Sequence, residues 1–208
     1  MTAHLIELGG AKAIGSALGA DYATVAAACT ALGATPARLV FLEDIPETTT
    51  VTFGAAHQID GKGYQWNLGT QTVGFGSNVA AVRNVYIDSN YNAAAAVFTG
   101  SNDVTWENVV FDFTGVASLS ARIGQPTGVG KKWNFLGNCK VLGPDNARSS
   151  PLLACTSIGA LLNAESLEFV GAGASASNYF ENGQHFNADL IIFSGSFHAT
   201  NAAWLTSG

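Results

Sequence analysis

The sequence predicts an all-β fold, a parallel β-helix of roughly seven turns, from two internal repeats and the content of each repeat. Glycines that follow a short apolar stretch recur at intervals of 24, 24, 35, 24 and 25 residues: Gly76, Gly100, Gly124, Gly159, Gly183 and Gly208. Between them runs a second series of apolar segments, which end at Asp88, Asp112, Gly143, Gly171 and Ser194. Each repeat holds strand-length runs rich in Val, Ile and Phe, divided by Gly, Asn, Ser and Asp. Three such strands close one turn of a coil in about 24 residues, whereas the helical periodicity that a helical repeat requires is absent after Pro36.

The composition restricts the class of protein further. The chain has 208 residues, of which 48% are hydrophobic and 12% charged, which indicates one folded domain rather than a disordered chain. Nine Lys and Arg against 15 Asp and Glu give a net charge of −6, which argues against a nucleic-acid partner, because phosphates require clustered basic residues. No apolar run approaches the roughly 20 residues of a membrane span, and the N-terminus lacks the basic region of a signal peptide. We therefore expect a protein that is made in the cytoplasm and does not associate with a membrane.

The first 36 residues are predicted to form an arm and a capping helix ahead of a β-helix domain at residues 37–208. Residues 1–20 are rich in Gly and Ala and have little capacity to fold alone. The segment from Asp21 to Leu32 is expected to be helical, because its apolar residues recur on one face and Gly33 follows as a stop signal. A solenoid needs its first turn covered, and this helix is expected to cover it.

Alignment of the second series predicts which side chains face the core. One column is apolar throughout and is expected to point inward: Tyr86, Val110, Val141, Phe169 and Ile192. The column before it contains two charges and is expected to point outward: Val85, Val109, Lys140, Glu168 and Ile191. The column after it is apolar although strand alternation places it outside: Ile87, Phe111, Leu142, Val170 and Phe193. Either the chain turns a corner there, or another chain covers this stripe, so these last five are candidate interface residues.

Asparagines recur with the same period. Asn84 and Asn108 lie 24 residues apart, as do Asn163 and Asn187. Asn tolerates left-handed turns and can hydrogen-bond to its counterpart on the next turn, so we expect asparagine ladders with a structural role.

Residues 21 to 115 resemble the pectin-lyase-like right-handed parallel β-helix superfamily. The resemblance rests on the helical stretch Ala23 to Cys29, the strand Leu39 to Leu42, and the turn Ile59 to Gly63, which reads Ile-Asp-Gly-Lys-Gly. It implies a right-handed coil and says little about activity, because the superfamily includes polysaccharide lyases and hydrolases, phage tailspikes, and virion proteins without a catalytic role. The clustered aspartates and the Gly-His-Gly of its hydrolases do not occur in this sequence, so no catalytic residue is transferred.

Asp88 and Asp112 are weak candidates for catalysis. They lie 24 residues apart and are expected to stack on neighbouring turns at about 5 Å, near the carboxylate separation of a retaining glycosidase. Their column continues with small residues that are typical of a turn, namely Gly143, Gly171 and Ser194. The turn interpretation and the catalytic one both remain open at this stage.

No metal site or cofactor is expected. Cys29, Cys139 and Cys155 show no metal-ligand spacing and are expected to be buried free thiols, and the four histidines are isolated in sequence. Four tryptophans could stack on sugars, but their spacing does not match the repeat and favours packing: Trp66, Trp106, Trp133 and Trp204.

These features predict a structural phage virion protein rather than an enzyme. A small β-helix that is poor in charge is suited to contact other proteins, because interface cores are depleted in charged residues. We expect a head-decoration (cement) protein, a homotrimer whose arm at residues 1–20 binds the major capsid protein. The alternative is a carbohydrate-active enzyme, or a receptor-binding tailspike fragment, that acts on polysaccharide.

Overall fold

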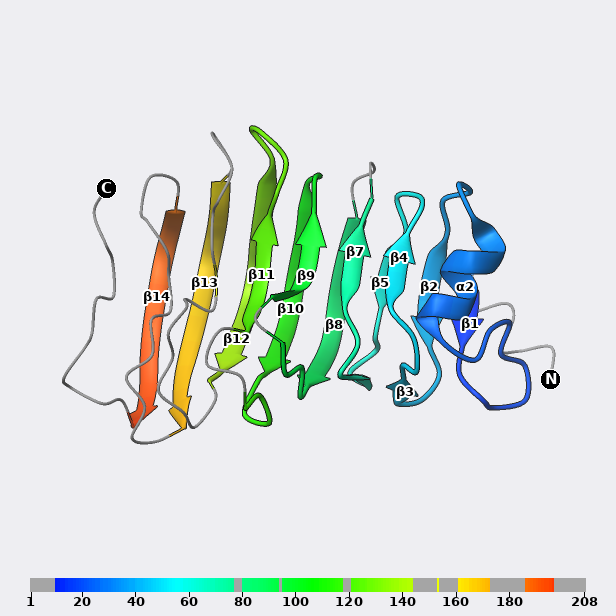
Figure 1. Cartoon of the computed structure of the whole chain (residues 1–208), viewed down its shortest axis with the longest axis horizontal. Coiled ribbons are helices and arrows are strands. Elements are labelled where there is room, and N and C mark those ends of the chain that lie inside the picture. Colours follow the sequence, from blue (N-terminus) through cyan, green and yellow to red (C-terminus); the bar gives the residue numbers. More distant parts are fainter. Residues whose placement is uncertain are drawn as a thin grey trace.

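Short segments rich in Val, Ile and Phe form strands that pair in parallel with the segment one turn further along the chain. In this computed structural model the result is a parallel β-solenoid of about six turns with one short helix near its N-terminus (Figure 1). The structure describes residues 10–76, 80–93, 95–117, 121–143, 153, 161–172 and 186–196. The expected parallel β-helix is confirmed, with about six turns where roughly seven were expected.

Within these residues the strands form two sheets, which we call the long and the short sheet. The long sheet follows the order β1-β2-β5-β8-β10-β12-β13-β14, and β6 joins it by pairing with both β3 and β8. Its strands are β1 (Lys12–Ile14), β2 (Arg38–Phe41), β3 (Ile45–Pro46), β5 (Gln58–Asp60), β6 (Gln65–Gly69), β8 (Ala80–Ser89), β10 (Val104–Asp112), β12 (Lys132–Leu142), β13 (Leu161–Ala172) and β14 (Phe186–Ser196). The short sheet has the order β11-β9-β7-β4, with β4 (Val51–Phe53), β7 (Val73–Phe75), β9 (Ala96–Gly100) and β11 (Arg122–Pro126). Successive strands of the long sheet lie side by side along the molecule (Figure 1).

The helix α2 (Val25–Leu32) lies at the N-terminal end of the solenoid, beside β1 and β2 (Figure 1). It begins four residues later than expected, because the Thr24 side chain caps it by accepting a hydrogen bond from the Ala27 amide at 3.1 Å. Gly33 ends the helix with a φ of 56°, as the sequence predicts. The buried Glu47 carboxylate accepts hydrogen bonds from the Val25 amide at 2.8 Å and from the Trp66 indole at 2.9 Å, which joins the helix to the core.

Part of the expected arm belongs to the sheet. Strand β1 pairs with β2, with Lys12 opposite Leu39, and Ala13 and Ile14 are buried. Residues 1–9 lie outside the described residues. The sequence did not show this pairing, because three residues are too few to reveal strand alternation.

Aromatic rings fill the interior between the two sheets. The Phe75 and Phe98 rings on neighbouring turns stack at 6.3 Å, and the Trp106 and Trp133 rings lie 5.7 Å apart edge to face. Trp66 is also fully buried, so packing is confirmed for three of the four tryptophans, and Trp204 lies outside the described residues. Cys29 and Cys139 are buried free thiols, as expected; burial raises their pKa to about 12 and about 11.

Left-handed residues bend three long strands, and strand alternation restarts at two of these bends. Asn84 in β8, Asn108 in β10 and Gly137 in β12 have left-handed backbones with φ of 51°, 53° and 63°. At Asn84 and Asn108 the side chains change face, so Val82 and Val85 both point inward although they are three residues apart. The bend of β12 holds one residue more, so Phe135 and Cys139 on either side of it point inward four residues apart. The chain therefore does reset its alternation, but before the stripe that suggested a corner.

This reset makes the two expected columns wrong in part: Val141 and Phe169 are buried and Lys140 and Glu168 face outward, as expected, but other members are exchanged. Val85 and Val109, expected outside, are buried, whereas Tyr86 and Val110, expected inside, face outward and are only partly buried. Between β10 and β12 the register also shifts, because β12 holds one residue more at its bend. The core row is Ile87, Phe111, Val141 and Phe169, and the outer row is Tyr86, Val110, Lys140, Glu168 and Ile192.

One asparagine ladder is confirmed and is longer than expected. The Asn163 amide donates to the Asn134 side-chain oxygen at 2.9 Å, and the Asn187 amide donates to the Asn163 oxygen at 3.3 Å. Asn84 and Asn108 occupy the expected left-handed positions. These amides align neighbouring turns of the long sheet.

Candidate functional site

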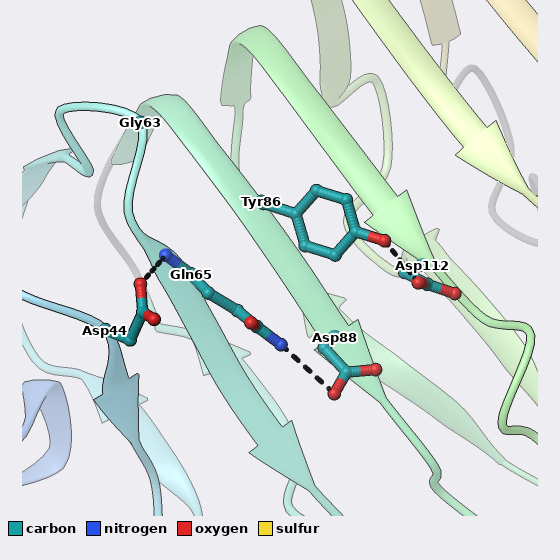
Figure 2. Close-up of a pocket in the computed structure, with 6 residues that line it drawn as sticks. All are labelled: Asp44, Gly63, Gln65, Tyr86, Asp88 and Asp112. Atoms are coloured by element: carbon teal, nitrogen blue, oxygen red, sulfur yellow. Dashed lines mark hydrogen bonds between the residues drawn. The ribbon is translucent and has the colours of Figure 1, made fainter.

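The outer face of the long sheet carries a recess of 460 Å³ (Figure 2). It forms where β3, β6, β8 and β10 follow one another, because side chains of one face in adjacent parallel strands are brought next to each other. Its lining is Asp44, Gly63, Gln65, Tyr86, Asp88 and Asp112. The sequence-predicted pair is thus confirmed as neighbours: Asp88 and Asp112 are register partners in β8 and β10.

Hydrogen bonds connect the polar groups of the recess. The main-chain amide of Gln65 donates to Asp44 at 2.8 Å, and the side-chain amide of Gln65 donates to Asp88 at 3.2 Å. The Tyr86 hydroxyl donates to Asp112 Oδ2 (Figure 2). The tyrosine and Asp112 were not linked in the sequence analysis, because Tyr86 was assigned to the core.

Asp112 also has a turn function. Its Oδ1 atom accepts hydrogen bonds from the Thr114 amide at 2.9 Å and from the Thr114 hydroxyl at 2.6 Å. An aspartate that bonds two residues ahead stabilises the turn that ends a strand. The expected continuation of this column into Gly143 is wrong, because Asp112 pairs with Leu142, and the row then passes through Val170 to Ser194.

The electrostatics of the recess follow from this crowding. Burial raises the pKa of Asp88, and the neighbouring Asp112 charge raises it further. Burial and then the hydrogen bond to Asp112 raise the pKa of Tyr86 to about 12, so the phenol stays a proton donor at neutral pH. The recess therefore offers acceptor carboxylates, one amide and one hydroxyl, a set that can bind hydroxyl-rich or cationic groups.

The candidate interface residues do not form one stripe. Ile87 and Phe111 are fully buried in the core, because the alternation restarts at Asn84 and Asn108. Leu142 and Val170 do face outward, as neighbours on β12 and β13, and are partly buried. Phe193 lies opposite Phe169 on β14, and its side chain is outside the described residues.

A different set of apolar side chains occupies the outer face, and we call it the outer apolar patch. It consists of Val110, Leu142, Val170, Leu190 and Ile192. Leu190 is 51% exposed and Ile192 40%, and the two lie two residues apart on one face of β14. An ion pair of 2.8 Å between Lys140 and Glu168 lies in the row that joins Val110 to Ile192.

The sequence analysis also missed a basic cluster on the same face. Arg38, Lys62 and Arg83 surround the carboxylate of Asp60, with nitrogen-to-oxygen distances of 2.9, 3.5 and 3.9 Å to Oδ2. The signal was the register of the solenoid, which places Asp60 opposite Arg83. The sequence repeat does not reveal that register, because the turn from Arg38 to Gln58 spans 20 residues and the turn from Asp60 to Arg83 spans 23, whereas the repeat is 24 residues long.

The described part of the chain has neither a metal-binding cluster nor a membrane-spanning helix. No group of three or more His, Cys, Asp or Glu side chains in these residues is arranged to hold a metal ion. No helix among them is long and apolar enough to cross a bilayer. Of the histidines only His57 is described; it is fully buried, and the other three lie outside the described residues.

Compared with family models, curated proteins and solved structures, the chain shows no significant match. The parallel β-solenoid is therefore established by its own strand pairing.

Proposed function

We propose that this chain is a non-catalytic structural protein of a bacteriophage virion, a head-decoration protein of the pectin-lyase-like superfamily. The observation that supports the proposal is the outer apolar patch. Leu190 and Ile192 are exposed on β14, where they lie opposite Ser166 and Glu168 of β13. Val170 and Leu142 are register partners on the two preceding strands and face the same side of the sheet. Large apolar side chains gathered on one sheet face are typical of a surface that contacts another protein.

The ion pair within the patch suits an interface as well. Lys140 and Glu168 neutralise each other across adjacent strands, so the patch has no net charge. A partner surface can then cover it without burying an unpaired charge, and the pair adds a requirement for correct register. We propose that this face mediates homotrimer formation and contact with the major capsid protein.

The proposed attachment arm is shortened by the structure. Because β1 is part of the long sheet, only residues 1–9 remain as the segment that we propose binds the capsid. Synthesis in the host cytoplasm and incorporation into the virion belong to the same proposal.

An Ile192→Glu substitution tests the role of the patch. It places a charge on an exposed side chain, so we expect the wild-type melting temperature but loss of the oligomer and of binding to phage heads. Analytical ultracentrifugation and co-sedimentation with heads measure the two effects. Thr52→Glu is the matched control, because Thr52 is exposed on β4 of the short sheet. A wild type that sediments as a monomer and does not bind heads would overturn the proposal.

A second candidate function, binding or cleavage of polysaccharide, is favoured by the recess with Asp88 and Asp112 on adjacent strands. Against catalysis, both oxygens of Asp112 already accept hydrogen bonds from Tyr86 and Thr114. We expect no reducing ends or unsaturated products from acidic and neutral polysaccharides. Product formation that disappears in both Asp88→Asn and Asp112→Asn would establish the second candidate instead.

A further inference from the structure

We propose that Arg38, Lys62 and Arg83 form a binding site for a phosphate group, the doubly charged phosphoryl group of free phosphate or of a phosphate ester. The three cations come from β2, from the turn after β5, and from β8. The register of the long sheet brings them together on its outer face, next to the recess, to which Gly63 also contributes. The inference does not depend on the virion function proposed above.

The charges of this basic cluster do not balance. Among the described ion pairs, one carboxylate, Asp60, faces all three cations. The other ion pairs of the described residues are one to one, Lys12 with Asp21 and Lys140 with Glu168. The three cations and Asp60 together thus carry an excess of two positive charges, although the whole chain has a net charge of −6.

The Asp60 carboxylate has no capacity left to satisfy these cations. Its side chain is 5% exposed, and its Oδ1 accepts hydrogen bonds from the Lys62 amide at 3.3 Å and the Asn84 amide at 3.2 Å. Arg38, Lys62 and Arg83 are 43%, 52% and 33% exposed at their side chains. Asp60 therefore holds the three cations in place, and their side chains remain partly exposed, although the Nε atom of Arg83 is itself buried without a hydrogen-bond partner.

The remaining donors match a tetrahedral dianion. A guanidinium has five N–H donors, and Arg38 uses one of them on Asp60, while Arg83 places one near Gln58 Oε1 at 3.5 Å. Two guanidinium groups and one ammonium provide the planar and point-charge donors that proteins use for phosphate. A charge of −2 on the ligand equals the local excess, which favours a phosphate monoester or free phosphate over a carboxylate.

The test is a titration of 15N-labelled protein with inorganic phosphate at constant ionic strength, with chloride as the compensating anion. We expect saturable shifts of the Lys62 and Arg83 amides with a dissociation constant of about 1 mM or tighter, and no such shifts with chloride alone. Arg38→Gln and Lys62→Gln should each weaken binding about tenfold, through loss of one charge-assisted hydrogen bond.

Lys140→Gln is the matched control, since it removes the same charge from a balanced pair on β12, and it should bind phosphate as the wild type does. Glucose 6-phosphate separates the two sources: equal affinity indicates a site for free phosphate, and tighter binding indicates a phosphate ester. Shifts that do not saturate, or equal weakening in Arg38→Gln and Lys140→Gln, would show nonspecific screening and overturn the site.

Discussion

At the scale of single residues, His57 is the least compensated polar group of the described core. Its ring is fully buried against Phe53, with 5.7 Å between the ring centres, and neither ring nitrogen makes a hydrogen bond of ordinary length and angle, although the Ala37 carbonyl lies near. Burial lowers the pKa of His57 below its ordinary value of 6.5, and the Ala37 carbonyl opposes this in part. The folded protein thus keeps the neutral imidazole to a lower pH than the unfolded chain, which takes up a proton as the pH falls through 6.5.

This predicts acid sensitivity that depends on one side chain. The unfolded state binds more protons between pH 6.5 and the lower pKa of the folded state, so the free energy of unfolding should fall as the pH falls through this range. The slope from this group approaches about 1.4 kcal/mol per pH unit. His57→Phe should remove that part of the slope, as measured by urea denaturation between pH 7.5 and 5. Equal slopes in both proteins would show that another group is responsible.

At the scale of elements, the bends in β8, β10 and β12 determine which residues form the core. Asn108 lies between Trp106 and Val109, both buried, so the inward and outward positions exchange at this point of β10. Neighbouring strands bend at the same height, and the asparagines of two bends bond to neighbouring turns. Asn108 Oδ1 accepts from the main-chain amide of Asn138 on the next turn at 3.0 Å, and the Asn84 side chain donates to Asp60 Oδ1 on the preceding turn at 3.2 Å.

Two neighbouring substitutions test this assignment. Phe111→Asp places an unpaired charge in the core and should unfold the protein or destabilise it by more than about 4 kcal/mol. Val110→Asp places the same charge on the outer face and should cost less than about 1 kcal/mol. Circular dichroism with chemical denaturation measures both. If Val110→Asp were the more damaging of the two, the alternation described here would be incorrect.

At the scale of the whole molecule, the end of the solenoid is closed by β1 and α2 together. Without β1, the edge of β2 would have no backbone partner on that side, and the first turn would lose the buried side chains of Ala13 and Ile14. An uncovered edge strand exposes unpaired backbone groups and promotes aggregation.

Two truncations distinguish the segment that we propose attaches to the capsid, residues 1–9, from the part of the N-terminus that the fold needs. Removal of residues 1–9 should leave the melting temperature unchanged, whereas removal of residues 1–20 deletes β1 and should lower it or cause aggregation. Differential scanning calorimetry with size-exclusion chromatography measures the outcome. An undisturbed fold after removal of residues 1–20 would show that β1 contributes little to the stability of the first turn.

The sequence by itself determined the repeat, the parallel β-solenoid, the helix stop at Gly33, the buried thiols, and the neighbouring positions of Asp88 and Asp112. These features follow from the local chemistry of the residues and from the repeat period of the sequence. Only the tertiary structure decided which face each strand residue occupies, because a single left-handed residue such as Asn84, or one extra residue in β12, inverts all later positions. The basic cluster and the outer apolar patch depend on that register, since their members come from different turns and become neighbours only when the turns are stacked.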